Sequence, residues 1–237
     1  MGAAVSAAGI RKRFGALEVL KGIDLEVAEG TTYGLLGPSG SGKSTLIRLL
    51  LGLSRADAGE VRVLGRRMPD RAILADVGYM PQAPSLYMDL TARENVAFFA
   101  GVQGIRERST IDEVLDIVQL RDRADSPMHT FSGGMVNRTS LACALVHKPR
   151  LLFLDEPTVG LDPLLRRSFW EHFRRLNGEG VTIILTSHLM DEAENADRLG
   201  LIRFGIFLAE GTPAEIVAAS GTSTLGEAFL KLAEAQE

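Results

Sequence analysis

Nine consecutive residues have the composition and spacing of a phosphate-binding loop. The segment Gly37-Pro38-Ser39-Gly40-Ser41-Gly42-Lys43-Ser44-Thr45 matches the pattern G-x-x-x-x-G-K-[ST] at every position. Its glycines allow the backbone to wrap closely around a polyphosphate, and successive N–H groups can donate to the anion. Lys43 is expected to reach the β- and γ-phosphates, and Ser44 to offer its hydroxyl to Mg²⁺. The sequence therefore predicts a site for a nucleoside triphosphate.

Two adjacent carboxylates, Asp155 and Glu156, directly follow the apolar run Leu151-Leu152-Phe153-Leu154. At the carboxyl edge of a parallel sheet they would lie beside the phosphate loop, where ligands bind in such folds. Asp155 is then placed to hold Mg²⁺ through water, and Glu156 to orient or deprotonate an attacking water.

A second anion site is predicted at Ser132-Gly133-Gly134, which lies within Phe131-Ser132-Gly133-Gly134-Met135 and opens a helix. A serine hydroxyl, glycine N–H groups and a helix N-terminus together favour an anion. One chain supplies no second phosphate for this site, so the γ-phosphate bound by a second copy is the economical partner. An ordinary glycine-capped helix start is the alternative for this segment taken alone.

The elements that must position these residues alternate between strands and helices, which indicates an α/β fold with a mostly parallel sheet. A buried strand is expected at residues 32–36, followed by the loop and a helix at about 45–51. Further strands are expected at 151–154, 181–185, 199–202 and 206–208. Between the first two of these, Asp162-Pro163 caps a helix that should end near Gly178.

The remaining regions complete the expected architecture. Residues 5–27 carry short apolar runs broken by glycines, and we expect an N-terminal antiparallel β region of strands and turns there. Residues 84–130 are expected to form an inserted helical sub-domain. Four capping boxes mark helix starts, at Thr91/Glu94, Thr110/Glu113, Thr212/Glu215 and Thr224/Glu227. We expect one domain over residues 1–237, with an α/β core at 1–83 and 131–237.

Composition excludes several classes of protein. The net charge of −4 and the absence of a long basic tract argue against nucleic acid as a partner. Cys143 is the one cysteine in the sequence, so neither a disulfide framework nor a paired-cysteine metal site is expected. No apolar stretch approaches the ~18 residues that span a bilayer. Membrane association would therefore require a partner.

The order and content of these motifs resemble ATP-binding cassette (ABC) transporter ATPase subunits over essentially the whole chain. Residues 37–45 look like the Walker A loop, residues 151–156 like Walker B, and Ser132-Gly133-Gly134 like the signature motif. The resemblance implies ATP and Mg²⁺ as cofactors. It also assigns roles to five further residues: Gln82 at Mg²⁺, Asp162 in the D-loop, His188 at the γ-phosphate, and Phe14 with Val19 at adenine.

The same resemblance implies assembly and direction. Two ATPase subunits would close head to tail over two ATP molecules, and closure would drive a separately encoded transmembrane permease. The subunit would then be peripheral, at the cytoplasmic face of the membrane. Met135 replaces the usual glutamine after the signature glycines, and Ser85-Leu86-Tyr87 precedes Leu90-Thr91. Both features resemble the ABC-2 type branch that exports drugs and polysaccharides.

Three other functions are less well supported. A cytosolic ABC ATPase without a transport role usually has tandem cassettes or a long coiled-coil insert, and neither is present in this sequence. A GTPase would need a guanine-reading N-K-x-D stretch, which is absent. A small-molecule P-loop kinase would leave Ser132-Gly133-Gly134 unexplained.

Overall fold

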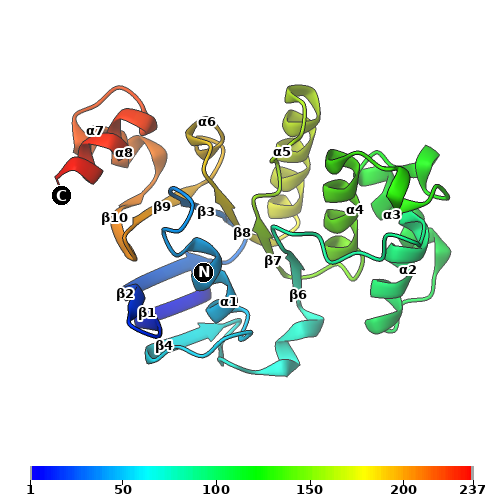
Figure 1. The fold of residues 1–237 in the computed structure, drawn as a ribbon, viewed down its shortest axis with the longest axis horizontal. Coiled ribbons are helices and arrows are strands. Elements are labelled where there is room, and N and C mark those ends of the chain that lie inside the picture. Colours follow the sequence, from blue (N-terminus) through cyan, green and yellow to red (C-terminus); the bar gives the residue numbers. More distant parts are fainter. Residues whose placement is uncertain (1, 236–237) are drawn as a thin grey trace. The chain divides into compact units, whose positions relative to one another are not determined.

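The computed structural model describes residues 2–235, which form two compact units (Figure 1). Unit 1 consists of Met1–Ile73 and Thr182–Glu237, and unit 2 of Leu74–Val181. The expected division into a core and a helical sub-domain at 84–130 stays a prediction, and its limits at residues 1 and 237 lie outside the described residues. Within residues 2–235, none of the helices combines the length and hydrophobicity that a membrane span requires.

Unit 1 begins with an antiparallel sheet whose strand order is β2-β1-β4-β5. The first two strands are 12 residues each, longer than the short runs expected from the sequence. Gly9 and Gly22 do not break them, because the register shifts at both places and positive φ angles of 60° and 97° absorb the irregularity. The strands are β1 (Ala3–Phe14), β2 (Leu17–Ala28), β4 (Ala58–Val63) and β5 (Arg66–Arg67).

The second sheet region of unit 1 is built around β3 (Thr32–Leu36), in which every residue is buried. It pairs in parallel with β8 (Thr182–Ser187) and β9 (Arg198–Arg203), and β9 pairs antiparallel with β10 (Ile206–Gly211). Helix α1 (Lys43–Leu50) starts earlier than the expected residue 45, because Gly42 in a left-handed conformation is its N-cap.

Three helices complete the end of unit 1: α6 (Met190–Ala193), α7 (Pro213–Ser220) and α8 (Leu225–Glu234). The capping box at Thr212/Glu215 is confirmed. At Thr224 only half of the box forms, since the Glu227 carboxylate accepts from the Ser223 N–H at 2.8 Å instead. On α8, Leu225 and Ala228 are buried, and Phe229 and Leu232 pack on the same hydrophobic cluster.

Unit 2 combines a parallel strand pair with helices. Strand β6 (Val77–Met80) lies beside β7 (Leu151–Asp155), and the short 3₁₀ helix η1 (Arg71–Ala75) contains the point where unit 1 passes into unit 2. The helices are α2 (Ala92–Val102), α3 (Arg108–Ile117), η2 (Arg121–Arg123), η3 (Met128–Thr130), α4 (Gly133–Leu145) and α5 (Pro163–Gly178).

The two predicted capping boxes in unit 2 have different outcomes. The box at Thr91/Glu94 is confirmed at the start of α2. The box at Thr110/Glu113 is wrong: α3 begins at Arg108, and its N-cap Glu107 makes no side-chain cap. Thr110 already lies in the first turn, where its N–H bonds the Glu107 carbonyl. One side of α3 and its C-cap is apolar and buried, and it consists of Ile111, Val114, Leu115 and Val118.

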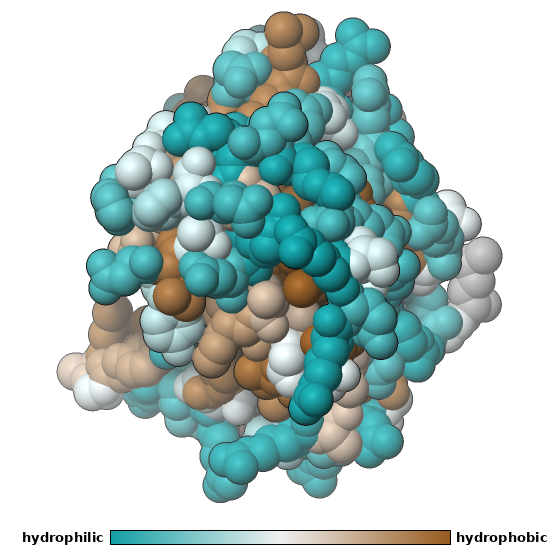
Figure 2. Space-filling model, turned by 90° about the vertical axis from the view of Figure 1, so that its right-hand side faces the viewer, coloured by the Kyte–Doolittle hydropathy of each residue, from teal (hydrophilic) through white to brown (hydrophobic). Residues whose placement is uncertain are grey.

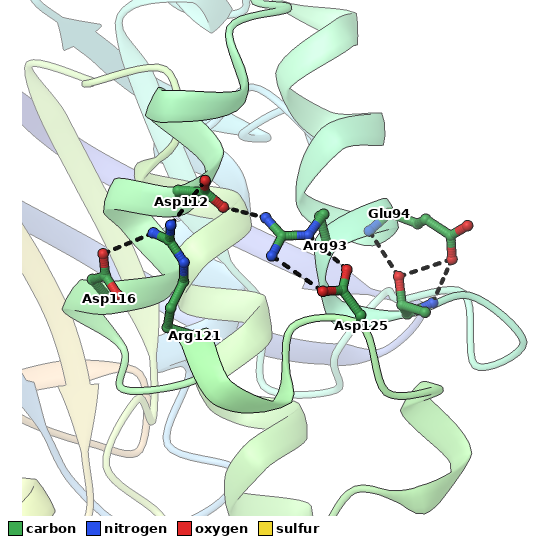
Figure 3. A network of polar contacts seen from close by, with 7 residues as sticks. Arg93, Glu94, Asp112, Asp116, Arg121 and Asp125 are labelled. Carbon is green, nitrogen blue, oxygen red and sulfur yellow. Dashed lines mark hydrogen bonds and ion pairs between the residues drawn. The ribbon is translucent and has the colours of Figure 1, made fainter.

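A network of charged side chains ties α2 to α3 and to the segment after η2 (Figure 3). Arg93 pairs with Asp112 and donates to Asp125 at 2.7 Å, while Arg121 reaches Asp112 at 3.0 Å and Asp116 at 2.9 Å. The hydrogen bond from Arg93 is the main cause that lowers the pKa values of Asp112 and Asp125. The network therefore stabilises the packing of α2 on α3 as long as Asp112 and Asp125 are ionised.

Candidate functional site

The phosphate loop follows the carboxyl end of β3, and its glycines are required by close neighbours. A Cβ at Gly37 would lie 2.1 Å from the Ile202 carbonyl oxygen. A Cβ at Gly42, whose φ is 110°, would lie 2.8 Å from Leu20 Cδ2 and 3.2 Å from the Val19 carbonyl oxygen. The loop backbone is thus fixed from both sides by β2 and β9, as a close-fitting anion cradle requires.

Lys43 lies at the centre of this loop. Its ammonium group donates to the carbonyl oxygens of Gly37 at 2.7 Å and Pro38 at 3.0 Å, and the residue is only 5% exposed. The Ser41 hydroxyl is also buried and has no hydrogen-bond partner. A buried polar group without a partner is costly, so a ligand that accepts from Ser41 would relieve this cost. The loop therefore fits a polyphosphate.

The other loop residues face outward or open the helix. Pro38, Ser39 and Gly40 are exposed, while Ser44 and Thr45 are partly buried in the first turn of α1. Because the N–H groups at a helix start point along its axis, this end of α1 favours anions.

The residues expected at adenine lie in the same unit. Phe14 ends β1, is 56% exposed, and has the Lys12 ammonium 5.4 Å from its ring centroid. Val19 is partly buried in β2 and touches the loop at Gly42.

His188, the residue expected at the γ-phosphate, is exposed directly after β8. The roles expected for these residues remain predictions.

In unit 2 the two carboxylates follow β7 as expected. Asp155 is the last residue of this fully buried strand, and Glu156 comes next with a left-handed φ of 56°. Gln82 Nε2 donates to Glu156 Oε2 at 3.2 Å. The contact arises because β6 and β7 pair with Met80 opposite Leu154, so the residues after both strands leave the sheet together. The sequence alone did not predict that Gln82 would bind Glu156.

The signature segment opens α4 as predicted. Ser132 is the N-cap, and its Oγ accepts from the Met135 N–H at 3.3 Å. Asp162 in turn is the N-cap of α5 and accepts from the Leu165 N–H at 3.0 Å.

The D-loop region packs directly on the start of α4. A Cβ at Gly134 would lie 3.1 Å from the Gly160 carbonyl oxygen, and Asn137 Nδ2 donates to the Val159 carbonyl oxygen at 3.1 Å. Asn137 was not predicted to have a site role. Its short amide side chain one helical turn after Gly133 was the available signal.

Arg138, also on α4, donates to the carbonyl oxygens of Val118 and Gln119 at 3.1 and 3.0 Å. These carbonyls lie at and after the C-cap of α3, so Arg138 ties the signature helix to α3.

Comparison with known proteins gives concordant results. A family model described as ABC transporter matches residues 20–159. "Nod factor export ATP-binding protein I" of Rhizobium sp. (strain N33) is 43% identical over 220 residues, which cover 90% of this chain and 72% of that protein. "Probable multidrug ABC transporter ATP-binding protein YbhF" of Escherichia coli (strain K12) is 39% identical over 96% of this chain, which spans 41% of that protein.

Solved structures with the same fold include an ATP-binding subunit of an ABC transporter, with a TM-score of 0.88 and 28% identity over 97% of this chain and 99% of that one. Another is a dimeric ATP-binding cassette in a post-hydrolysis state bound to ADP and Pi. Its TM-score is 0.81 with 26% identity, over 88% of this chain and 98% of that one.

Proposed function

The chain belongs to the ABC transporter family and is an ATP-binding cassette ATPase, and we propose that it drives export through a separate membrane permease. The family and the P-loop α/β fold class that the motifs predict are confirmed. The observation that carries the catalytic part of the proposal is the phosphate loop, with its glycine cradle, its buried Ser41 hydroxyl and the central Lys43.

Each catalytic residue has a specific task in this proposal. Lys43 moves its ammonium group from the loop carbonyls to the β- and γ-phosphates of ATP. Glu156 orients the attacking water and accepts its proton, and the amide of Gln82 holds that carboxylate in place. His188 contacts the γ-phosphate.

Ser44, Asp155 and Gln82 would hold Mg²⁺. Their oxygen atoms are of the kind that Mg²⁺ prefers, and the contact of Gln82 Nε2 with Glu156 leaves the amide oxygen of Gln82 for the ion. A Mg²⁺ ion held by these residues would supply positive charge against the negative charge that develops on the phosphates. Among the described residues, no three or more His, Cys, Asp or Glu side chains are grouped so that they could hold a metal ion.

The active form is a head-to-tail dimer. Ser132, Gly133 and Gly134 at the N-terminus of α4 would bind the γ-phosphate of ATP held by a second copy. The D-loop residue Asp162 would lie at the interface. The residues just before it, Val159 and Gly160, contact the start of α4, which would therefore move with the D-loop. The dimeric state of a related ATP-binding cassette supports this arrangement.

Unit 2 offers a surface for the permease. A groove of about 350 Å³ lies among β6, α2 and α4, with Leu86, Phe99 and Ala144 in its apolar lining. Tyr87 and Val102 beside it are 51% and 70% exposed. Figure 2, which faces the side of the molecule where α2 and α3 lie, shows apolar surface gathered within a hydrophilic surround. An apolar helix of the permease fits this groove and would hold the subunit at the cytoplasmic face of the membrane.

Export is favoured over import by the names of the relatives, which are an export ATP-binding protein and a probable multidrug transporter ATP-binding protein. Met135 and Ser85-Leu86-Tyr87 resemble the same branch. The substrate class would be set by the permease.

A Glu156→Gln variant tests the catalytic part of the proposal. With Mg-ATP it should dimerise, measured by light scattering, while its ATP hydrolysis falls at least about 100-fold because the general base is lost. Glu171→Gln, which changes an exposed carboxylate on α5, should leave both properties as in the wild type. A monomer at saturating Mg-ATP would refute the dimer.

Purification of the tagged protein from detergent-solubilised native membranes tests the transport part. A polytopic membrane protein in near-equal amount is the expected result. Ribosomal or DNA-repair partners in its place would instead establish a cytosolic ABC ATPase.

A further inference from the structure

The turn between β9 and β10 places a bulky aromatic residue in an unfavourable conformation. Arg203 pairs with Ile206, so Phe204 and Gly205 alone form the turn, with φ angles of 53° and 79°. A two-residue turn with both φ values positive strongly prefers Asn-Gly, and a bulky side chain at its first position is an outlier. Phe204 is nonetheless 48% exposed, so burial of its ring does not compensate fully for this conformation. Strain of this kind accumulates at functional sites.

This turn is fixed at two points against β2, the strand that also borders the phosphate loop. Gly205 accepts a hydrogen bond from the Lys21 N–H at 2.9 Å, and a Cβ at Gly205 would lie 2.2 Å from the Val19 carbonyl oxygen. The carbonyl oxygen of Ile202, two residues before Phe204, lies close against Gly37 at the start of the phosphate loop. The same Val19 carbonyl oxygen lies close against Gly42, near the end of the phosphate loop. The turn therefore stands at the flank of the loop where Val19 lies.

The ring of Phe204 carries a cation on one side. The Arg203 guanidinium carbon is 4.4 Å from the ring centroid, a cation–π contact that holds the ring in the exposed position. An exposed aromatic face next to a guanidinium is the chemistry that binds a planar, electron-rich ring such as a purine base.

We propose that Phe204 is a second aromatic contact for the adenine base, in addition to Phe14. The inference rests on the proposed function, since it takes the triphosphate to lie in residues 37–45 and the base to lie toward Val19. Phe204 then packs against the base from the β9–β10 turn, while Phe14 approaches from the end of β1. In this proposal the strained conformation of the turn has a function, because it holds the Phe204 ring against the adenine base.

The test replaces Phe204 with the residue that the turn itself prefers. Phe204→Asn suits the positive φ, so the hairpin keeps its fold, which a thermal melt followed by circular dichroism checks. Affinities for Mg-ADP and for inorganic pyrophosphate are measured by titration calorimetry. The affinity for ADP should fall at least about fivefold, the size expected for one lost base–aromatic stack, while that for pyrophosphate stays unchanged. Phe204→Tyr, which keeps the ring, should bind ADP as the wild type does.

Leu64→Asn is the matched control. Leu64 and Gly65 form the same kind of turn between β4 and β5, with φ angles of 47° and 76°. The Leu64 N–H bonds the Ala4 carbonyl of β1, and a Cβ at Gly65 would meet no atom within 4 Å. This variant should leave the ADP affinity unchanged. An unchanged ADP affinity in Phe204→Asn would overturn the inference, and so would an equal loss for ADP and pyrophosphate, because the turn would then support the loop and not the base. A wild-type protein that binds neither molecule would overturn the proposed function itself.

Discussion

Asn95 is the side chain whose removal should most weaken the segment between Gln82 and α2. It is fully buried and makes three hydrogen bonds: it accepts from the Tyr87 N–H at 2.8 Å and donates to the carbonyls of Tyr87 at 3.0 Å and Thr91 at 2.9 Å. At about 1 kcal/mol net for each bond, Asn95→Ala should lower the free energy of unfolding by about 3 kcal/mol. That is a large fraction of the ~5–15 kcal/mol that stabilises a typical domain.

Urea unfolding followed by tryptophan fluorescence measures this effect. Trp170 is the one tryptophan of the sequence, and it is buried in unit 2 with Asn95. With an m value of ~1–3 kcal/mol/M, the midpoint should fall by about 1–3 M. Gln103→Ala is the control, because it removes one exposed hydrogen bond to the Leu74 carbonyl. It should lower the free energy of unfolding by less than about 1 kcal/mol. A loss below about 1 kcal/mol for Asn95→Ala would show that water replaces these bonds and would refute the reasoning.

Asn95→Asp separates the donor bonds from the acceptor bond. The new carboxyl could still accept from the Tyr87 N–H, but it would face the carbonyl oxygens of Tyr87 and Thr91, and burial there raises its pKa. A folded-state pKa above the unfolded value makes the ionised form costly, so stability is lost as pH rises through that pKa. The variant should therefore be closer to the wild type at pH 4 than at pH 8. A deficit equal at both pH values would contradict this account.

Three further predictions concern charge, capping and the thiol. Arg93→Met should destabilise the protein at pH 7. Its deficit should shrink below about pH 4, because the low pKa values of Asp112 and Asp125 in the folded state stabilise only while both are ionised; a pH-independent deficit would show that only packing was lost. Asp162→Ala removes the N-cap of α5 and should lower the free energy of unfolding, measured in urea, by about 1 kcal/mol. Asp162→Asn keeps a capping oxygen and should retain most of the wild-type stability. Because burial raises the pKa of the Cys143 thiol, a thiol reagent at pH 8 should label it only after unfolding, and rapid labelling of the native protein would refute its burial.

The sequence predicted those parts of the fold and site that depend on local rules. The phosphate loop could be found because its geometry admits only glycine at positions such as Gly37 and Gly42, so spacing alone carries the information. Capping boxes are less certain. Thr91/Glu94 and Thr110/Glu113 have the same spacing, yet only the first starts a helix, since the second lies inside a turn that Glu107 already begins.

The contacts between distant segments could not be predicted in this way. Gln82 meets Glu156 because β6 and β7 are neighbours in register, and Asn137 meets the Val159 carbonyl because the D-loop region packs on α4. Each contact depends on pairing between segments, which no single local pattern encodes. The strain at Phe204 is hidden for the same reason, since the turn type depends on how β9 pairs with β10.

The placement of β3 between β8 and β9 has a consequence for the synthesis of the chain. Thr32 pairs with Ile183, and the nearby Gly30 N–H bonds the Thr182 hydroxyl across 152 positions of sequence. The strand that carries the phosphate loop therefore leaves the ribosome long before either neighbour exists, whereas all of unit 2 is made in between. At ~5–20 residues per second this interval lasts about 7–30 s, during which both edges of β3 are open to wrong partners. A slowly translated stretch between residues 37 and 181 would lengthen that exposure and favour aggregation of the nascent chain.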